Sequence, residues 1–224
     1  PYKGKKMSIP FYRVEVGGDE REKIDEVLDG EAPNIIEDLE AAFESYVGAS
    51  YALATSHGTA ALHLAMLAID LKRGDKVLCS INAYPSLPEV VRHFDAEPIF
   101  IDINPDTFTI DLDKLEAYLA ENKSKKLKAV IVSHVAGQSV ELDRLYTIAK
   151  QYDVKIVEDA SDALGATYNG QKIGSTGADI TCFDFSPHLR RNVCNGGMMV
   201  CDDEEIMERA KSLRNHAMVI DDEA

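Results

Sequence analysis

The feature that most constrains the fold is a repeat of short apolar runs, each followed by a turn and then, in most cases, a helical segment. The runs begin at residues 51, 76, 97, 129, 154, 180 and 198. Strands that alternate with helices at this spacing indicate right-handed βαβ crossovers and a mainly parallel sheet with both faces covered. We therefore predict an α/β fold, a three-layer αβα sandwich around a mainly parallel seven-stranded sheet.

Length and charge narrow the class of protein. The 224 residues can bury one large core, and a net charge of −15 disfavours nucleic acid and anionic membranes as partners. No apolar run approaches the roughly 18 to 20 residues that cross a bilayer, and no signal peptide is visible, which favours a cytoplasmic location. The four cysteines form no CxxC pair, so we expect reduced thiols and no metal or redox site.

One strand ends on a carboxylate. The segment 154–165, VKIVEDASDALG, is a β-branched apolar run that stops at Glu158 and Asp159. Ligands of open α/β sheets bind outside the carboxyl ends of the strands, so Asp159 is a candidate ligand-binding group. A simple cap for the segment that follows is an equally good interpretation of this stretch alone.

Three further candidates follow other strands. The turn Ser56-His-Gly-Thr-Ala60 opens a helix and is either an anion site or an ordinary N-cap. Tyr84 could stack on a planar ligand or be a core aromatic, and His134 could be functional or a hydrogen-bonded structural group. Together with Asp159 they would share one sheet edge, which suits a phosphorylated aromatic cofactor such as pyridoxal phosphate. In such a site an aspartate keeps the pyridine nitrogen protonated.

The order of longer motifs carries a resemblance. The chain resembles the DegT/StrS-type nucleotide-sugar aminotransferases, a branch of the fold type I pyridoxal-phosphate enzymes. The resemblance runs through ATSHGTAALHLA, EPIFIDINPDTFTID, VSHVAGQSVELDRL, VEDASDALGATYNGQKIGSTGADITCFDFSP and NGGMMVCDDEE. It implies that residues 1–224 form the large, cofactor-binding domain of this fold. The family's smaller C-terminal domain would then be absent from this chain.

The resemblance also implies roles for particular residues. Gly58 and Thr59 would bind the cofactor phosphate, Tyr84 would stack on the ring, and Asp159 would pair with the pyridine nitrogen. His134 would lie under or beside the ring. Members of the family are homodimers that move an amino group from glutamate to a keto sugar on a nucleotide diphosphate, through a pyridoxamine intermediate. A nucleotide sugar, glutamate and a second copy of the chain are therefore the expected partners.

The segment CFDFSPHLRRNVCNGG departs from the family pattern CFSFHPVKNITTGEGG. Leu189 stands where the Schiff-base lysine is expected, and no lysine lies between Lys172 and Lys211. Asp184 replaces a serine that donates to the phosphate, and Asp162 replaces the usual Gln or His after the aspartate. A carboxylate at Asp184 would repel a phosphate at close range unless a cation intervenes.

The missing lysine leaves three interpretations open. Leucine can neither anchor the cofactor covalently nor transfer a proton, so pyridoxal or pyridoxamine phosphate would be held without a covalent bond. The chain is then a sugar aminotransferase homologue with altered chemistry, a lysine-free pyridoxamine-dependent sugar dehydratase, or an inactive homologue with a binding or regulatory role. In the dehydratases a histidine replaces the lysine. His188, one position early, is the candidate base here, although a one-residue shift on an extended segment reverses the side chain.

Overall fold

The computed structural model describes residues 16–186 and 195–218. A single sheet forms the middle layer, and its strands run in the order β1-β9-β8-β5-β4-β2-β3. Their bounds are β1 Tyr51–Thr55, β2 Lys76–Ser80, β3 Glu97–Ile101, β4 Leu127–Ser133, β5 Lys155–Asp159, β8 Ile180–Asp184 and β9 Gly197–Cys201. Within this sheet β9 pairs antiparallel with β1 and β8, while the remaining neighbours pair in parallel. The predicted α/β class and the seven strands are confirmed, and each strand begins within two residues of its predicted position.

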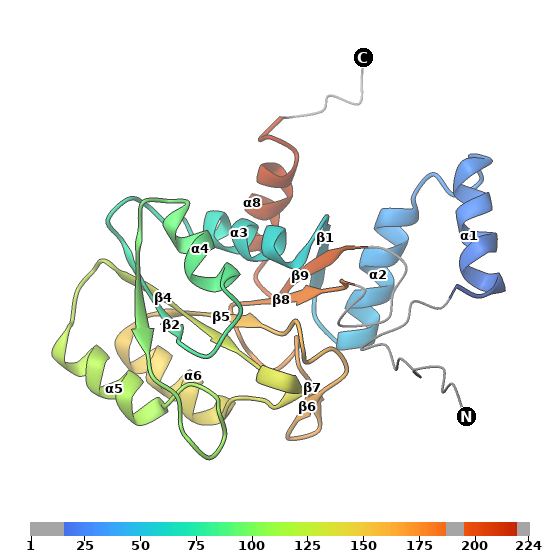
Figure 1. The fold of residues 1–224 in the computed structure, drawn as a ribbon. Coiled ribbons are helices and arrows are strands. Elements are labelled where there is room, and N and C mark those ends of the chain that lie inside the picture. Colours follow the sequence, from blue (N-terminus) through green and yellow to red (C-terminus); the bar gives the residue numbers. More distant parts are fainter. Residues whose placement is uncertain (1–15, 187–194, 219–224) are drawn as a thin grey trace, which may run out of the picture.

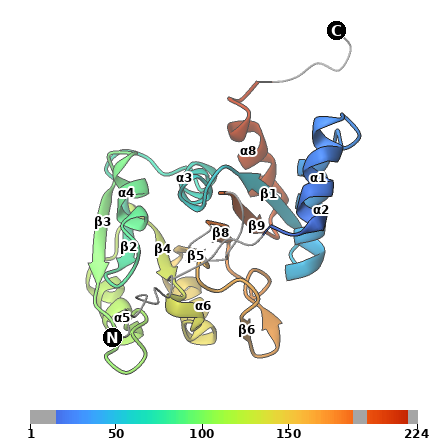
Figure 2. The same ribbon diagram turned by 45° about the vertical axis from the view of Figure 1, so that its right-hand side comes forward.

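Helices cover both faces of the sheet (Figures 1 and 2). They are α1 Gly18–Leu28, α2 Ile35–Val47, α3 Gly58–Ala68, α4 Ser86–Arg92, α5 Leu112–Glu121, α6 Leu142–Tyr152 and α8 Glu204–Arg214. Buried residues of α3, α4 and α8 share one apolar cluster, and buried residues of α2, α5 and α6 share the other. These two clusters on either side of the sheet are the two cores of a three-layer sandwich.

Successive residues of each central strand supply the two cores alternately. Ala129 and Ile131 of β4 belong to the cluster of α3, whereas Val130 and Val132 belong to the cluster of α6. On β5, Val157 likewise faces α3. Because side chains alternate along a strand with a period of two, the same count decides which face each polar residue at the strand ends occupies.

The chain also forms a separate hairpin and an exposed first helix. The short strands β6 Thr167–Tyr168 and β7 Gln171–Lys172 form a separate antiparallel hairpin, and α1 has no buried residue. Within the described ranges no helix has both the length and the apolar character that a bilayer crossing needs.

The parallel strands bring distant residues to one edge. Ser133 at the end of β4 is the Cα partner of Asp159 at the end of β5, and Asp159 in turn is the partner of Cys182 on β8. The carboxyl ends of β4, β5 and β8 therefore lie side by side, next to the first turn of α3. This is the position at which open α/β sheets bind ligands.

Candidate functional site

A cavity of about 460 Å³ opens at this edge of the sheet. Its walls come from the start of α3, the loop before α4 and the ends of β4, β5 and β8. Six of the residues selected from the sequence line it, namely Gly58, Thr59, Tyr84, Asp159, Asp162 and Asp184. The structure thus brings together the expected helix turn, aromatic side chain and carboxylate in one cavity.

Asp159 is fixed on the α3 side of the sheet. Its carboxylate is only 4% exposed and accepts hydrogen bonds from Ser133 Oγ at 3.3 Å, Ser161 N at 3.1 Å and Ser161 Oγ at 2.5 Å. Burial raises the pKa of Asp159, and these hydrogen bonds, together with His134, act in the opposite direction. A buried carboxylate of this kind favours a cationic or proton-bearing partner in the cavity.

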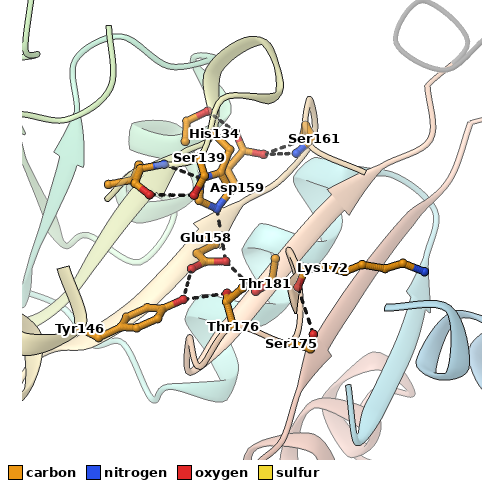
Figure 3. Close-up of polar contacts among 12 residues, drawn as sticks. His134, Ser139, Tyr146, Glu158, Asp159, Ser161, Lys172, Ser175, Thr176 and Thr181 are labelled. Carbon is orange, nitrogen blue, oxygen red and sulfur yellow. Dashed lines mark hydrogen bonds and ion pairs between the residues drawn. The ribbon is translucent and has the colours of Figure 1, made fainter. Parts of the chain in front are cut away.

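His134 is not among the residues that line the cavity. Its imidazole, labelled in Figure 3, is fully buried on the α6 side of the sheet. Its Nδ1 accepts a hydrogen bond from Val140 N at 3.2 Å. Its Nε2 lies 3.3 Å from Glu158 Oε2 but makes no well-aligned hydrogen bond within the described part of the chain. The expectation that His134 lies beside a ring in the cavity disagrees with this placement, because His134 and Ser133 point to opposite faces.

Glu158 is the centre of a buried polar cluster on that same far face. Its carboxylate is fully buried and accepts hydrogen bonds from Tyr146 Oη at 2.6 Å and Thr181 Oγ1 at 3.1 Å. The hydroxyl of Thr176 lies 2.9 Å from Tyr146 Oη and extends the cluster (Figure 3). The adjacent residues Glu158 and Asp159 therefore anchor the end of β5 on both faces of the sheet.

The first turn of α3 is the expected phosphate site. The Gly58 N–H donates to Asp184 Oδ2 at 3.1 Å, and the Thr59 N–H contacts His57 Nδ1 at 3.4 Å. His57 Nδ1 also lies 3.2 Å from Asp184 Oδ2. One nitrogen cannot donate to Asp184 and accept from Thr59 at once, so the tautomer of His57 decides which of these two contacts is a hydrogen bond.

His57 is a site residue that the sequence interpretation missed, because that interpretation assigned phosphate binding to Gly58 and Thr59. Its Nε2 lies 3.3 Å from Ser186 Oγ, which gives the order Ser186–His57–Asp184 of a hydrolase triad. Ser186 is only 1% exposed, so its hydroxyl cannot attack a substrate in the cavity. The imidazole of an N-capping histidine next to Gly58 was the available sequence signal.

Tyr84 and Asp162 lie toward the mouth of the cavity. Tyr84 is 69% exposed, so it is not a core aromatic, and its ring is available for stacking. Asp162 is exposed, and its Oδ2 accepts a hydrogen bond from Ala136 N at 3.2 Å.

The segment CFDFSPHLRRNVCNGG, which departs most from the family pattern, lies partly outside the described residues. The predictions for His188 and Leu189 fall on that undescribed part. No lysine is present among the described residues that line the cavity. The two lysines that flank the departing segment are engaged elsewhere. Lys172 Nζ donates to the carbonyl of Tyr46 at 2.5 Å, and Lys211 Nζ pairs with Glu208 at 3.2 Å.

Gly197 of β9 packs closely against the backbone at the start of α3. We therefore expect Gly197→Ala to destabilise the protein. A Cβ at this position would lie 2.5 Å from the backbone carbonyl of His57 and 2.7 Å from Gly58 N. Backbone atoms cannot move aside as a flexible side chain can, so we expect a loss of about 1–3 kcal/mol in the free energy of unfolding. Urea unfolding measures this loss.

Gly18→Ala is the matched control, because a Cβ there meets nothing within 4 Å at the first position of α1. Alanine also favours helix over glycine, so this variant should be neutral or slightly more stable. Equal effects of the two substitutions would contradict the close approach of β9 to the turn before α3.

Comparison with known proteins identifies the family. The model of the family described as "DegT/DnrJ/EryC1/StrS aminotransferase family" matches residues 15–224 of this chain. The chain is 34% identical over 214 residues to an uncharacterized protein of Methanocaldococcus jannaschii, with 94% of this chain and 54% of that protein covered. It is 33% identical over 217 residues to the GDP-perosamine synthase of Caulobacter vibrioides, with 95% of this chain and 57% of that protein covered.

A solved structure agrees with these relatives. The PMP form of a Streptococcus pneumoniae protein described as a sugar aminotransferase has a TM-score of 0.83 and 28% identity, and the match covers 96% of this chain and 59% of that one. The chain spans about half the length of the curated relatives that it matches. It belongs to the DegT/DnrJ/EryC1/StrS aminotransferase family.

Proposed function

We propose that this chain is the cofactor-binding large domain of a sugar aminotransferase-type protein that holds pyridoxamine phosphate or pyridoxal phosphate without a covalent bond. The observation that carries this proposal is the buried Asp159 carboxylate inside the 460 Å³ cavity, with Tyr84 also on its wall. A protonated pyridine nitrogen would supply the positive charge that such a carboxylate favours.

The residues of the cavity fit the aromatic part of this cofactor. Asp159 would hold the proton at the pyridine nitrogen, Ser133 and Ser161 would keep its carboxylate in place, and Tyr84 would stack on the ring. When bound, the cofactor supplies an electron-withdrawing ring next to the carbon that carries the amino group. The family resemblance predicts Gly58 and Thr59 as phosphate donors, although Gly58 N–H already donates to Asp184.

The partners that we propose are those that the family resemblance suggests. One relative of this chain is a GDP-perosamine synthase, whose name refers to a nucleotide-linked amino sugar. We propose a nucleotide-linked keto sugar as the substrate class, glutamate as the amino donor, and a homodimer as the working form. A pyridoxamine-dependent dehydration with His188 as the base is the version of this chemistry that does not need a lysine.

A second candidate function is a binding or regulatory role without turnover. The sequence favours it at one point, because Leu189 stands at the expected lysine position and no lysine lies between residues 172 and 211. Both candidates require a cofactor site or its remnant at Asp159, and they differ in whether a bound nucleotide sugar is converted.

Titration of the full chain with each cofactor tests the proposal. We expect calorimetry to detect binding of pyridoxamine phosphate, and we expect borohydride treatment with pyridoxal phosphate to leave every lysine unmodified in mass spectra. A reduced adduct on a lysine would contradict the non-covalent site, and the absence of binding of either cofactor would remove the proposal. If the cofactor binds, sugar dehydration that is lost in His188→Ala would favour the enzyme, and binding without turnover would favour the second candidate.

A further inference from the structure

The two backbone N–H groups expected to hold the cofactor phosphate already contact side chains of the same chain. Gly58 N–H donates to Asp184 Oδ2 at 3.1 Å, and Thr59 N–H lies 3.4 Å from His57 Nδ1. The first N–H groups of a helix have no partner within the helix and attract anions. In this chain the anion at the first turn of α3 is the carboxylate of Asp184.

Asp184 is held firmly in this position. It is only 7% exposed, its Oδ1 accepts a hydrogen bond from Ser186 N at 2.6 Å, and its Oδ2 lies 3.2 Å from His57 Nδ1. Both carboxylate oxygens therefore have partners among the described residues. A ligand that displaces the carboxylate must replace these contacts.

Space and charge both oppose a phosphate at the same point. A Cβ built on Gly58 would lie 2.6 Å from the Asp184 side chain, so the volume directly above Gly58 is filled. Asp159 and Asp162 line the same cavity, and among the described residues of its wall His57 is the basic side chain, with Nδ1 3.2 Å from Asp184. A phosphate monoester, with about 1.5 to 2 negative charges, would enter a site that already has three carboxylates.

We propose that Asp184 is a specificity-determining residue that occupies the phosphate position as an internal anion. The cavity then binds the pyridine ring of the cofactor and discriminates against its phosphate. This inference rests on the proposed function for the ring, but the competition at the first turn of α3 concerns phosphate itself and can be tested without a ring.

The test compares pyridoxamine phosphate with unphosphorylated pyridoxamine by calorimetry on the full chain. We expect Asp184→Ser and Asp184→Asn to raise the affinity for pyridoxamine phosphate on the order of 10- to 100-fold, because a charged hydrogen-bond competitor is removed. The affinity for pyridoxamine should change less than about threefold, because the ring site is untouched. Asp25→Asn, an exposed aspartate on α1, removes the same charge elsewhere and should change neither affinity.

The outcomes separate this inference from the proposed function. A ratio of the two affinities that is the same in wild type, Asp184→Ser and Asp184→Asn would overturn the inference while leaving the ring site intact. A gain in Asp184→Ser alone would also overturn it, since a new hydroxyl donor and not the lost charge would then explain the effect. Melting temperatures of each variant before addition of ligand show that it is folded.

Inorganic phosphate tests the competition with Asp184 without any binding of a pyridine ring. If neither pyridoxamine phosphate nor pyridoxamine binds the wild type or either variant, the proposed function fails. The measurement is then the melting temperature with millimolar phosphate, which should rise more in Asp184→Ser and Asp184→Asn than in the wild type. A shift in the two variants alone supports the internal anion, and equal shifts in all three proteins refute it.

Discussion

Asp159→Asn is expected to lower the affinity for pyridoxamine phosphate by about 100-fold. Truncating or neutralising one partner of a buried, hydrogen-bonded charge pair costs about 2–5 kcal/mol of binding free energy. Asp159 is almost completely buried and its carboxylate accepts three hydrogen bonds, so asparagine can occupy the same space without its charge. Calorimetric titration of the wild type and the variant measures the loss.

The same substitution should have the opposite effect on stability without cofactor. Burial raises the pKa of Asp159, so the folded state binds this proton more tightly than the unfolded state does. The contribution of the group to stability is then fully present below the unfolded pKa of about 3.9 and declines as pH rises through the raised folded pKa. Asparagine does not titrate, so Asp159→Asn should be more stable than the wild type at neutral pH.

Urea unfolding of both proteins between pH 4 and pH 8 checks this second effect. The difference in free energy of unfolding should be near zero at the acid end and grow with pH. Asp25→Asn is the matched control, because it makes the same substitution at an exposed position on α1. A variant that binds pyridoxamine phosphate within threefold of the wild type would remove Asp159 as the partner of the ring nitrogen.

The sequence was sufficient for the fold and for most of the cavity, because both depend on local patterns. Strand runs followed by helices specify βαβ units, and strand ends of a parallel sheet meet at one edge whatever their separation in sequence. Asp159, Gly58 and Tyr84 were found in this way, and all three line the cavity.

The sequence interpretation fell short at two histidines, for different reasons. His134 follows a strand end, but counting from Ile131, which faces α3, already puts it on the α6 side with Glu158. The role of His57 needed tertiary information, since its partners Asp184 and Ser186 are more than 120 residues away. The replacement of a serine by Asp184 was visible in the sequence, whereas its hydrogen bond to Gly58 was not.

Glu158→Ala is expected to reduce the free energy of unfolding by about 3–5 kcal/mol. The fully buried Glu158 carboxylate accepts hydrogen bonds from Tyr146 and Thr181. Alanine would remove this acceptor from both hydroxyls inside an apolar layer. Tyr146 retains its contact with Thr176, so the largest penalty falls on the Thr181 hydroxyl. Removing one member of a buried polar cluster costs the desolvation of the groups that remain.

Glu158→Gln separates the loss of charge from the loss of hydrogen bonds. The amide oxygen can still accept from Tyr146, so we expect a smaller cost of about 1–2 kcal/mol. Glu116→Ala is the control for a half-exposed pair, because Glu116 lies 3.3 Å from Arg144 and its loss should change stability by less than about 1 kcal/mol. Because Glu158 precedes Asp159 on β5, Glu158→Ala should also weaken binding of pyridoxamine phosphate, whereas Glu158→Gln should keep it. A Glu158→Ala protein as stable as Glu116→Ala would show that the cluster does not hold the strand end in place.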